Sequence, residues 1–338
     1  MAMTAAHTPM FEQLAEPLRR EIKLHCYRML GSLHEAEDVL QDTYLRAWRG
    51  FGGFAGGSFR AWLYRIATNA CLDALAQRKS ARRLLPDQLG PASLGVLEGG
   101  PATEVAWLEP YPDADIEAIA DPAPTPEARY TARESVQLAF VAAIQQLPPR
   151  QRAALMLCDV LGWAVAEAAT LLGGSTASIN SALQRARETL ARRYPEGRPL
   201  EAARPDAAQQ LLLGRYMRAW EGHDLDGLVA LLKEDATLAM PPWPQWYAGR
   251  EAVRTVFAQV WHAHCGVTRL VPIAANGQPA FAVYEREGED QGGTRWAARA
   301  IHVLALRGDA IAEVTLFTPP LGPRLFRAFG VPELLDGA

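Results

Sequence analysis

The segment from residue 86 to residue 127 constrains the fold more than any other part of the chain, because its composition does not suit one continuous domain. It contains nine acidic residues and no lysine or arginine, with prolines and glycines throughout. Such a composition is typical of a linker. A chain of 338 residues is long enough for about two to three domains. We therefore predict a multidomain protein with an acidic linker at residues 86–126.

The net charge of −4 conceals an uneven distribution. Residues 1–85 and 128–200 each carry +4, residues 86–127 carry −9, and residues 201–338 carry −3. Two modestly basic units therefore flank the linker, which suits a nucleic-acid partner.

The cysteines and the apolar runs indicate the compartment. The four cysteines lie far apart without paired spacing, which argues against a zinc site or a disulfide framework. The sequence has no apolar run of about twenty residues, and Met1 to Met10 lack the pattern of a signal peptide. We expect a cytoplasmic protein with no metal, no cofactor and no membrane contact.

Two amphipathic helical patterns lie between His34 and Asp73, separated by a glycine-aromatic hinge at Gly50 to Ser58. The first places an apolar face inward, formed by Leu33, Ala36, Leu40, Thr43 and Ala47. The second places inward Leu63, Ile66, Ala67 and Ala70. Before them, residues 11–32 predict helices whose buried side holds Leu14, Leu18, Ile22 and Tyr27 or Met29.

The outward residues of these two patterns carry the chemistry. The first helix is acidic outside, with Glu37, Asp38, Gln41 and Asp42, and the second opens with Phe59, Arg60, Trp62, Tyr64 and Arg65. Aromatic rings beside arginines at a flexible hinge suit unstacked bases and their phosphates. An ordinary helical bundle with core aromatics and solvated charges explains any one of these residues equally well.

The strings EDVLQDTYLRAW and FRAWLYRIATNACLDAL resemble conserved region 2 of the extracytoplasmic-function sigma factors, bacterial initiation subunits of RNA polymerase. In that family the acidic helix docks on the clamp helices of the β′ subunit, and the next helix opens the minus-ten element. The resemblance implies a region 2 helical bundle at residues 10–85. It implies docking by Glu37, Asp38, Gln41 and Asp42, and melting by Phe59, Arg60, Trp62, Tyr64, Arg65 and Asn69.

Two neighbouring segments leave alternatives open. The basic helix end with Arg78, Lys79, Arg82 and Arg83 suits a phosphate backbone or simple solvation. Within the linker, VAWLEPYPDADI is too aromatic for a spacer, so we expect packing on a neighbouring domain by Trp107, Leu108 and Tyr111. Its acids either imitate nucleic acid in a polymerase channel or belong to a solvated tether. Similar linkers occur in family members with an extra C-terminal domain.

A second helical unit is predicted at residues 127–195. A helix from Pro126 to Ile144 precedes LPPRQR, whose prolines end one helix and open the next. The string WAVAEAATLL, a turn at Gly173-Gly174, and STASINSALQRARETLARR predict a helix-turn-helix. The last helix buries a stripe of Ile179, Leu183, Ala186 and Leu190. Its other face shows amides, hydroxyls and arginines, which suit reading of the major groove.

This segment resembles sigma region 4, including the LPPRQR entry and the helix ending in RARETL. The resemblance implies that the minus-thirty-five bases face Ala177, Ser178, Asn180, Ser181 and Gln184, and that the backbone is held by Arg185, Arg187, Arg192 and Arg193. Asn180 and Ala182 stand where other members often carry basic residues, so the sequence preference stays open. Alone, a helix-turn-helix indicates only DNA binding.

The last part of the chain predicts an α+β domain at residues 205–325. Two helices, a strand, a proline-aromatic loop and another helix precede four strands at 267–275, 279–286, 294–307 and 310–317. We expect a curved antiparallel sheet. The strings YMRAWEGHDLDGLVALLKEDATLAMPP and WYAGREAV resemble the SnoaL-like branch of the cone-shaped fold shared with ketosteroid isomerases and nuclear transport factor two.

A cone-shaped fold encloses a pocket, so an enzyme must be considered. The polar candidates are Tyr216, Asp235, His262, His264 and His302, and none falls in a signature that we can transfer. His262 and His264 are two residues apart on a helix, which is poor geometry for a metal. Trp243, Trp246 and Tyr247 line the pocket or belong to the core. We expect no enzymatic activity and no catalytic residue, because a fold does not imply a function.

These resemblances imply a sigma factor that directs promoter-specific transcription initiation. Its partners would be the β and β′ subunits of core RNA polymerase and promoter DNA, and its SnoaL-like domain would modulate activity. Two alternatives remain open: a helix-turn-helix regulator without polymerase, and a bifunctional protein with a catalytic last domain. A small ligand of the last domain also stays open.

Overall fold

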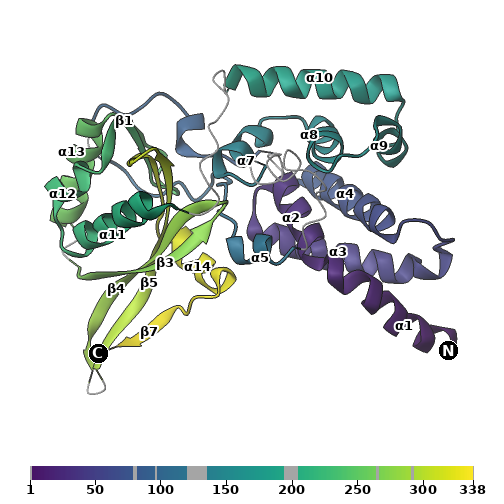
Figure 1. The fold of residues 1–338 in the computed structure, drawn as a ribbon, viewed down its shortest axis with the longest axis horizontal. Coiled ribbons are helices and arrows are strands. Elements are labelled where there is room, and N and C mark those ends of the chain that lie inside the picture. The colour runs from purple at the N-terminus through teal and green to yellow at the C-terminus, as the bar shows by residue number, and fades with distance from the viewer. Residues whose placement is uncertain are drawn as a thin grey trace. The chain divides into compact units, whose positions relative to one another are not determined.

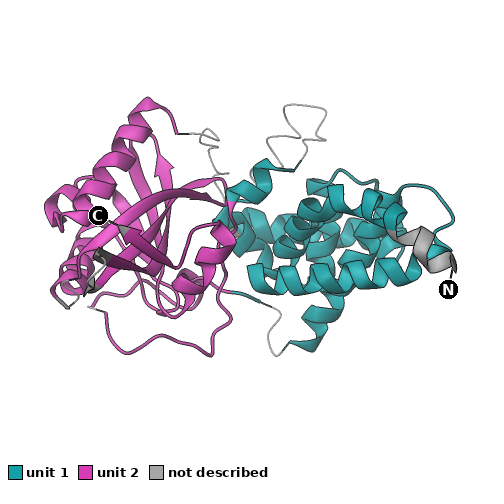
Figure 2. Ribbon diagram, turned by 90° about the horizontal axis from the view of Figure 1, so that it is seen from below, with its two compact units in different colours: residues 1–83, 113–198 teal, residues 84–112, 199–338 magenta. Residues whose placement is uncertain are grey.

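The computed structural model describes residues 2–78, 82–95, 97–119, 135–193, 205–263, 266–290 and 293–337. The chain forms two compact units, Met1–Arg83 with Asp113–Arg198, and Leu84–Pro112 with Pro199–Ala338 (Figure 2). The linker predicted at residues 86–126 is therefore divided: its first part folds with the C-terminal unit, and the helix that follows folds with the first. None of the described helices is long and apolar enough to cross a membrane.

The first half of unit 1 is a bundle of four helices with two short 3₁₀ turns (Figure 1). Its elements are α1 (Ala2–Ala15), η1 (Glu16–Leu18), α2 (Arg19–Leu30), α3 (Leu33–Gly50), η2 (Phe51–Gly53) and α4 (Phe59–Gln77). Gly31, at φ 70°, ends α2 in the left-handed conformation, where glycine has no steric cost. Ser32 caps α3 and Ser58 caps α4, each by accepting a backbone N–H three residues on.

The predicted inward face of α3 is confirmed, since all five of its residues are buried. In the preceding helices the prediction is confirmed at Ile22, Tyr27 and Met29 but wrong at Leu14, which is 37% exposed. Phe11 is buried instead. Phe11 and Ala15, four residues apart on α1, form the buried side of that helix, and Leu14 lies beside this stripe instead of on it.

The second half of unit 1 carries the helix-turn-helix. Its elements are α5 (Asp113–Glu117), α7 (Leu138–Gln145), α8 (Pro149–Leu155), the π-helical turn η4 (Met156–Val160), α9 (Val165–Leu172) and α10 (Thr176–Arg193). Gly173, at φ 62°, ends α9 at the predicted turn. Ile179, Leu183 and Ala186 are buried as predicted. The helix expected from Pro126 begins at Leu138 in the described chain, and residues 120–134 lie outside the described part.

Unit 2 is a curved sheet covered on one face by α11 (Ala207–Glu221), α12 (Leu225–Val229) and α13 (Arg250–Ala263) (Figure 1). The strand order is β2-β1-β6-β5-β4-β3, with β7 paired to β5. The strands are β1 (Leu232–Ala239), β2 (Trp246–Ala248), β3 (Thr268–Ala275), β4 (Gln278–Asp290), β5 (Gly293–Arg307), β6 (Ala310–Phe317) and β7 (Leu334–Gly337). The chain also forms η3 (Pro86–Gln88), α14 (Leu321–Leu325) and η5 (Phe326–Phe329).

The four strands expected in the last part are present as β3 to β6, but the expected antiparallel pattern is wrong at one place. Strand β1 pairs with β6 in parallel, while the remaining pairs are antiparallel among the described strands. Parallel neighbours need a long crossover, and here α13 and the four strands β2 to β5 supply it. Such a long-range pairing leaves no local signal in the sequence.

Residues 84–112 close both edges of this sheet. Ser93 N–H donates to the carbonyl of Trp246 on the edge strand β2 (2.8 Å). At the other edge, Pro112 forms a β-bridge with Ala275 of β3, and the backbone N–H groups of Tyr111 and Asn276 each donate to the other residue (2.7 and 2.9 Å). The predicted packing is confirmed, since three linker side chains are buried in unit 2: Trp107, Leu108 and Tyr111.

Candidate functional site

The acidic side chains predicted for docking lie on the outer face of α3. Asp38 and Gln41 are exposed, and Glu37 and Asp42 are partly buried. Glu37 is held by two cations of α2, with Arg19 at 2.7 Å and Lys23 at 3.3 Å. Asp42 pairs with Arg46 of the same helix (2.8 Å). Two of the three acids on this face are therefore engaged in ion pairs, and Asp38 and Gln41 are its most accessible members.

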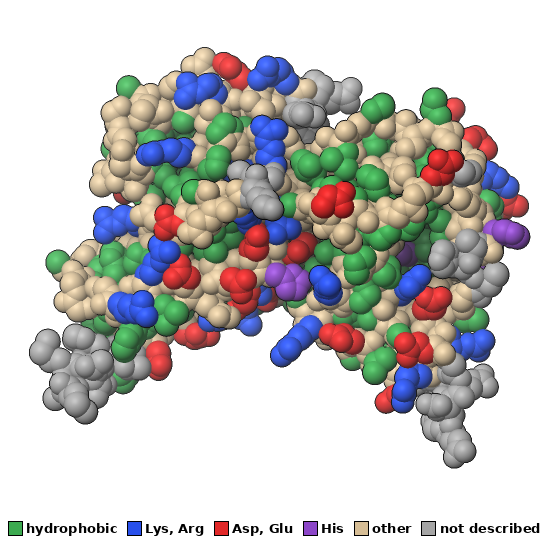
Figure 3. Space-filling model, turned by 180° about the vertical axis from the view of Figure 1, so that it is seen from behind, with side chains coloured by type: hydrophobic (Ala, Val, Ile, Leu, Met, Phe, Trp, Pro, Cys, Tyr) green, Lys and Arg blue, Asp and Glu red, His purple; other side chains and the backbone are tan. Residues whose placement is uncertain are grey.

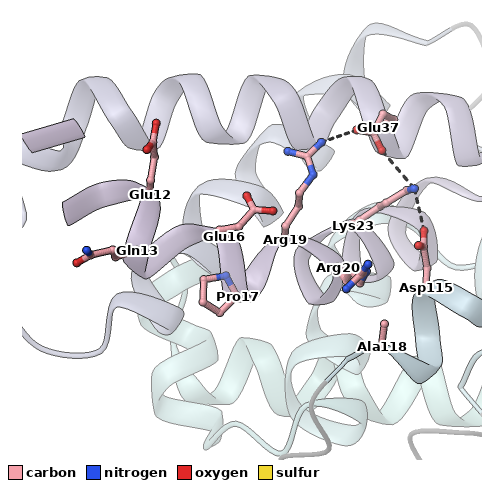
Figure 4. Close-up of a pocket in the computed structure, with 10 residues that line it drawn as sticks. All are labelled: Glu12, Gln13, Glu16, Pro17, Arg19, Arg20, Lys23, Glu37, Asp115 and Ala118. Atoms are coloured by element: carbon pink, nitrogen blue, oxygen red, sulfur yellow. Dashed lines mark hydrogen bonds and ion pairs between the residues drawn. The ribbon is translucent and has the colours of Figure 1, made fainter. Parts of the chain in front are cut away.

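An open pocket of about 770 Å³ lies beside Glu37 (Figure 4). Lys23 contacts Glu37 and also Asp115 of α5, at 2.9 Å, so the end of the linker joins this network. The pocket is lined by charges of both signs together with smaller groups: Glu12, Gln13, Glu16, Pro17, Arg19, Arg20, Lys23, Glu37, Asp115 and Ala118. This balance of charge suits a polar protein surface more than a small ion.

Two apolar side chains on the same helix were missed by the sequence analysis. Leu45 is 54% exposed and Trp48 is 41% exposed. They are three residues apart and so share one side of the helix, where they add apolar area beside the acidic side chains. Their signal in the sequence was their position outside the apolar stripe of α3, where a hydrophobic residue has no core to fill.

The side chains predicted to open the minus-ten element are only partly accessible. Arg65 and Asn69 are exposed, and Arg60 and Trp62 are partly buried. Phe59 and Tyr64 are buried, contrary to the outward placement expected from the helical pattern. Phe59 packs in an aromatic cluster whose other rings are Phe11, Phe51, Phe54 and Trp62.

Tyr64 is enclosed from three sides. Its hydroxyl donates to Glu21 Oε1 at 2.7 Å, and Arg60 also donates to that oxygen. Its ring makes edge contacts with His25 and with Trp163, at 5.0 and 5.8 Å between centroids. Because Trp163 belongs to the helix-turn-helix half, the two halves of unit 1 meet at this tyrosine. Burial raises the pKa of the Tyr64 hydroxyl well above its usual range.

Helix α10 displays the predicted minus-thirty-five residues. The side chains of the polar face are all exposed: Ala177, Ser178, Asn180, Ser181, Gln184, Arg185 and Arg187. Arg185 donates to Ser181 Oγ (2.6 Å), and Arg187 forms a bidentate pair with Asp159 (2.6 and 2.9 Å). Figure 3 shows basic and acidic side chains interspersed over one face of the molecule instead of one continuous basic patch.

A buried arginine joins the two halves of unit 1. Arg152 of α8 is fully buried and donates to the carbonyl of Met29, at the end of α2. Within its own half it donates to Gln145 Oε1 (2.7 Å), Gln145 O (2.8 Å) and Leu147 O (3.2 Å). Gln145 in turn donates to the carbonyl of Arg28 (3.1 Å). Burial lowers the pKa of Arg152 to about 9, with nearby Arg78 adding to the shift.

The basic end of α4 is engaged inside unit 1. Arg78 and Arg83 both pair with Glu35, the second at 3.0 Å, and their side chains are only 14% and 13% exposed. Simple solvation is therefore wrong for these two residues, and a phosphate would have to displace Glu35. Lys79 lies outside the described residues.

The interior of unit 2 is a core of aliphatic and aromatic side chains. Of the polar candidates, only Tyr216 and His302 come together, with 3.0 Å between the hydroxyl and Nδ1. Both are fully buried, and burial lowers the pKa of His302 to about 3 and raises that of Tyr216. Asp235 is exposed near Arg307 (3.8 Å), His262 is exposed on α13, and His264 lies outside the described residues. Neither buried group changes protonation near neutral pH, so the pair is poorly suited to acid-base chemistry.

Comparison with known proteins finds matches for both helical halves of unit 1 and for the α+β part of unit 2. The family models Sigma-70 region 2, Sigma-70 region 4 and SnoaL-like domain match residues 14–81, 137–190 and 213–314. The ECF RNA polymerase sigma factor SigG of Mycobacterium tuberculosis is 45% identical over 328 residues, covering 96% of this chain and 85% of that protein. The chain belongs to the extracytoplasmic-function (ECF) RNA polymerase sigma factors.

Two further comparisons concern the ECF sigma factor SigJ of M. tuberculosis. Its sequence is 29% identical over 222 residues, covering 66% of this chain and 62% of SigJ. Its crystal structure matches this ECF sigma factor with a TM-score of 0.58 at 22% identity, covering 94% of this chain and 97% of that chain. At this identity the match establishes the fold, two helical sigma regions followed by a SnoaL-like domain with a mixed sheet.

Proposed function

We propose that this sigma factor acts in the cytoplasm by binding core RNA polymerase, through its β and β′ subunits, and directing it to promoter DNA. The docking residues are Glu37, Asp38, Gln41 and Asp42, with Leu45 and Trp48 beside them. The observation that carries this proposal is the pairing of an acidic, partly apolar outer face on α3 with an open recognition face on α10. A simple DNA-binding regulator needs only the recognition face of α10, and that function does not explain the acidic face of α3.

Unit 1 has to open for both promoter elements to be read. Elements centred near positions −10 and −35 lie roughly 85 Å apart at about 3.4 Å per base pair. The halves of unit 1 are joined by Arg152 and by the Tyr64 contact with Trp163. In the proposed cycle, polymerase binding separates the halves and uncovers Tyr64 on the side of Trp163. The minus-ten strand then contacts Arg60, Trp62, Tyr64, Arg65 and Asn69 of α4, and Phe59 joins them when its ring leaves the aromatic cluster.

We further propose that the SnoaL-like domain regulates this opening without being an enzyme. The support is physical: residues 84–112, which connect the two DNA-binding halves, are folded into unit 2. Any change in unit 2 that releases them lengthens the free tether between the halves, which couples the domain to promoter affinity. The Tyr216 and His302 pair lies in an aromatic interior that does not favour proton transfer.

Run-off transcription with bacterial core polymerase on a promoter pool tests the proposal. The full chain should give promoter-specific transcripts, and Glu37→Lys with Asp38→Lys should reduce them at limiting protein concentration by weakening docking. Glu104→Gln, an exposed acid of the linker, is the control for loss of negative charge. Duplex binding without any transcript, on polymerase that works with another sigma factor, would instead support the simple regulator.

The same assay tests the regulatory role. A variant that ends near Arg204 lacks the surface that holds residues 84–112, so it should differ from the full chain in promoter-dependent transcription. Identical transcription from both proteins would refute regulation by the last domain. The sign of the difference gives the direction of control.

A further inference from the structure

Glu21 lies against a pair of side chains that also suits a phosphate. The Arg60 guanidinium donates to Glu21 Oε1 through Nε (2.8 Å) and through a terminal nitrogen, and the Tyr64 hydroxyl donates to the same oxygen (2.7 Å). The Arg60 guanidinium also lies 5.1 Å from the centre of the Tyr64 ring. One carboxylate oxygen therefore receives hydrogen bonds from both of these predicted minus-ten residues.

This cluster lies at the surface boundary and not deep in the core. The Glu21 side chain is 14% exposed and that of Arg60 is 37% exposed. On the same helix Arg65 and Asn69 are exposed, and the preceding hinge carries Gly56 and Gly57 at positive φ. A strand of nucleic acid that follows the opening of α4 can therefore reach the guanidinium once its present partner moves.

The chemistry of the two anions is alike. A guanidinium offers a planar fork that binds a carboxylate or a phosphate through paired hydrogen bonds. Proteins that bind single strands combine such cations with aromatic rings on which bases stack, and Trp62 lies one turn from Phe59 in the neighbouring cluster (5.4 Å between rings). The Arg60 guanidinium and the Tyr64 hydroxyl are therefore suited to bind a phosphate, and the Glu21 carboxylate now occupies that position.

We propose that Glu21 is an internal phosphate mimic, which neutralises Arg60 in the free protein and gives way to a backbone phosphate of the minus-ten strand. The inference rests on the proposed sigma function. It adds that Glu21 helps to set the affinity of the protein for promoter DNA. Each binding event then exchanges one ion pair for another, so Arg60 contributes little net free energy until Glu21 is removed. Glu21 is a positioning residue in this scheme, since it acts through Arg60 and not on DNA.

The experiment compares Glu21→Gln with wild type in the full chain bound to core polymerase. The readout is the fraction of open complex on a promoter selected by wild-type run-off transcription, measured over a series of salt concentrations. We expect promoter affinity to rise by about three- to tenfold, because the competing ion pair is lost. The slope of log affinity against log salt should steepen by about 0.7, one additional net phosphate contact on a single strand.

Three further variants make the result specific. Glu104→Gln removes the same charge at an exposed linker position and should leave affinity unchanged. Arg60→Gln should abolish the gain, so that Glu21→Gln has no further effect in that background. Glu21→Asp keeps the charge but shortens the side chain, so it should reproduce part of the gain even if the glutamine variant folds poorly.

The outcomes separate this inference from the function on which it rests. Absence of wild-type transcripts contradicts the sigma function itself. With wild-type transcription intact, a gain that survives in the Arg60→Gln background overturns the phosphate mimic. So does lower promoter affinity in Glu21→Gln and Glu21→Asp at unchanged melting temperature, since removing a competitor for Arg60 cannot weaken DNA binding by a folded protein.

Discussion

Replacing the buried Arg152 should destabilise unit 1 more than any exposed substitution. Arg152→Met keeps the length and apolar stem of the side chain but removes every donor. It leaves four buried acceptors without this partner, at Met29, Leu147 and two atoms of Gln145. At about 1 kcal/mol for each acceptor, and within the range of about 3–5 kcal/mol for breaking a buried ionic network, the expected loss is about 4 kcal/mol.

Calorimetry or urea unfolding of the full chain measures this loss. For a unit of this size a change of 1 kcal/mol moves the melting temperature by about 2–4 °C, so the transition of unit 1 should fall by roughly 10 °C while that of unit 2 stays in place. Arg150→Met is the matched control, because Arg150 is exposed on the same helix and donates to the carbonyl of Leu172 instead of to the buried network.

The control should change the free energy of unfolding by less than about 1 kcal/mol. Equal effects of the two substitutions, or a loss below about 1 kcal/mol for Arg152→Met, would refute the reasoning that this network holds unit 1 together. A further consequence can be checked with the same protein. Because Arg152 bonds across to Met29, the variant should also separate its two halves more readily, which limited proteolysis would show as faster cleavage within unit 1.

Three other predictions concern single side chains. Asn276→Ala should lower the stability of unit 2 by about 2–3 kcal/mol, because the Asn276 amide oxygen accepts from Tyr111 and the backbone φ of Asn276 is 56°. Limited proteolysis should then cut residues 84–112 faster. Asn276→Gly relieves the backbone strain but not the lost hydrogen bond, so it should show part of the effect. His302 has a pKa lowered to about 3 by burial, so the unfolded state binds the extra proton between pH 6.5 and about 3. The stability that depends on this group is therefore complete above pH 6.5 and falls by about 1.4 kcal/mol per pH unit below it. Urea unfolding at a series of acid pH values should show that the free energy of unfolding of His302→Asn depends less on pH than that of wild type. An unchanged dependence would contradict the assignment. Arg185→Ala should weaken duplex binding on all sequences alike and lower the salt slope by about 0.9, whereas a sequence-dependent loss in a binding titration would assign Arg185 to base reading.

Local features of the fold were predictable because they depend on near neighbours in the sequence. The buried stripe of α3 and the turn glycine at Gly173 follow from side chains within one or two helical turns. The strands β3 to β6 follow from alternation and turn residues in the same way. Each of these signals is complete within about ten residues.

Long-range features were not predictable on the same basis. Nothing in LPPRQR indicates that Arg152 reaches the carbonyl of Met29, 123 residues earlier. The burial of Tyr64 depends on Glu21 and Trp163, which lie far from it in sequence. The roles of the acidic face of α3 and of α10 stay predictions, because exposure shows that a partner can reach these residues and not which partner does.

The closing of both sheet edges by residues 84–112 has a consequence for the order of synthesis. A ribosome completes these residues long before strands β2 and β3, against which they fold. Domains generally fold as they emerge from the ribosome, N-terminal parts first. A nascent chain therefore holds two folded DNA-binding halves joined by residues 84–112 before those residues have strands to pair with. The sheet of unit 2 fixes residues 84–112 only when its strands have been synthesised, near the end of translation. A message truncated after region 4 would therefore yield a protein in which these residues are never fixed.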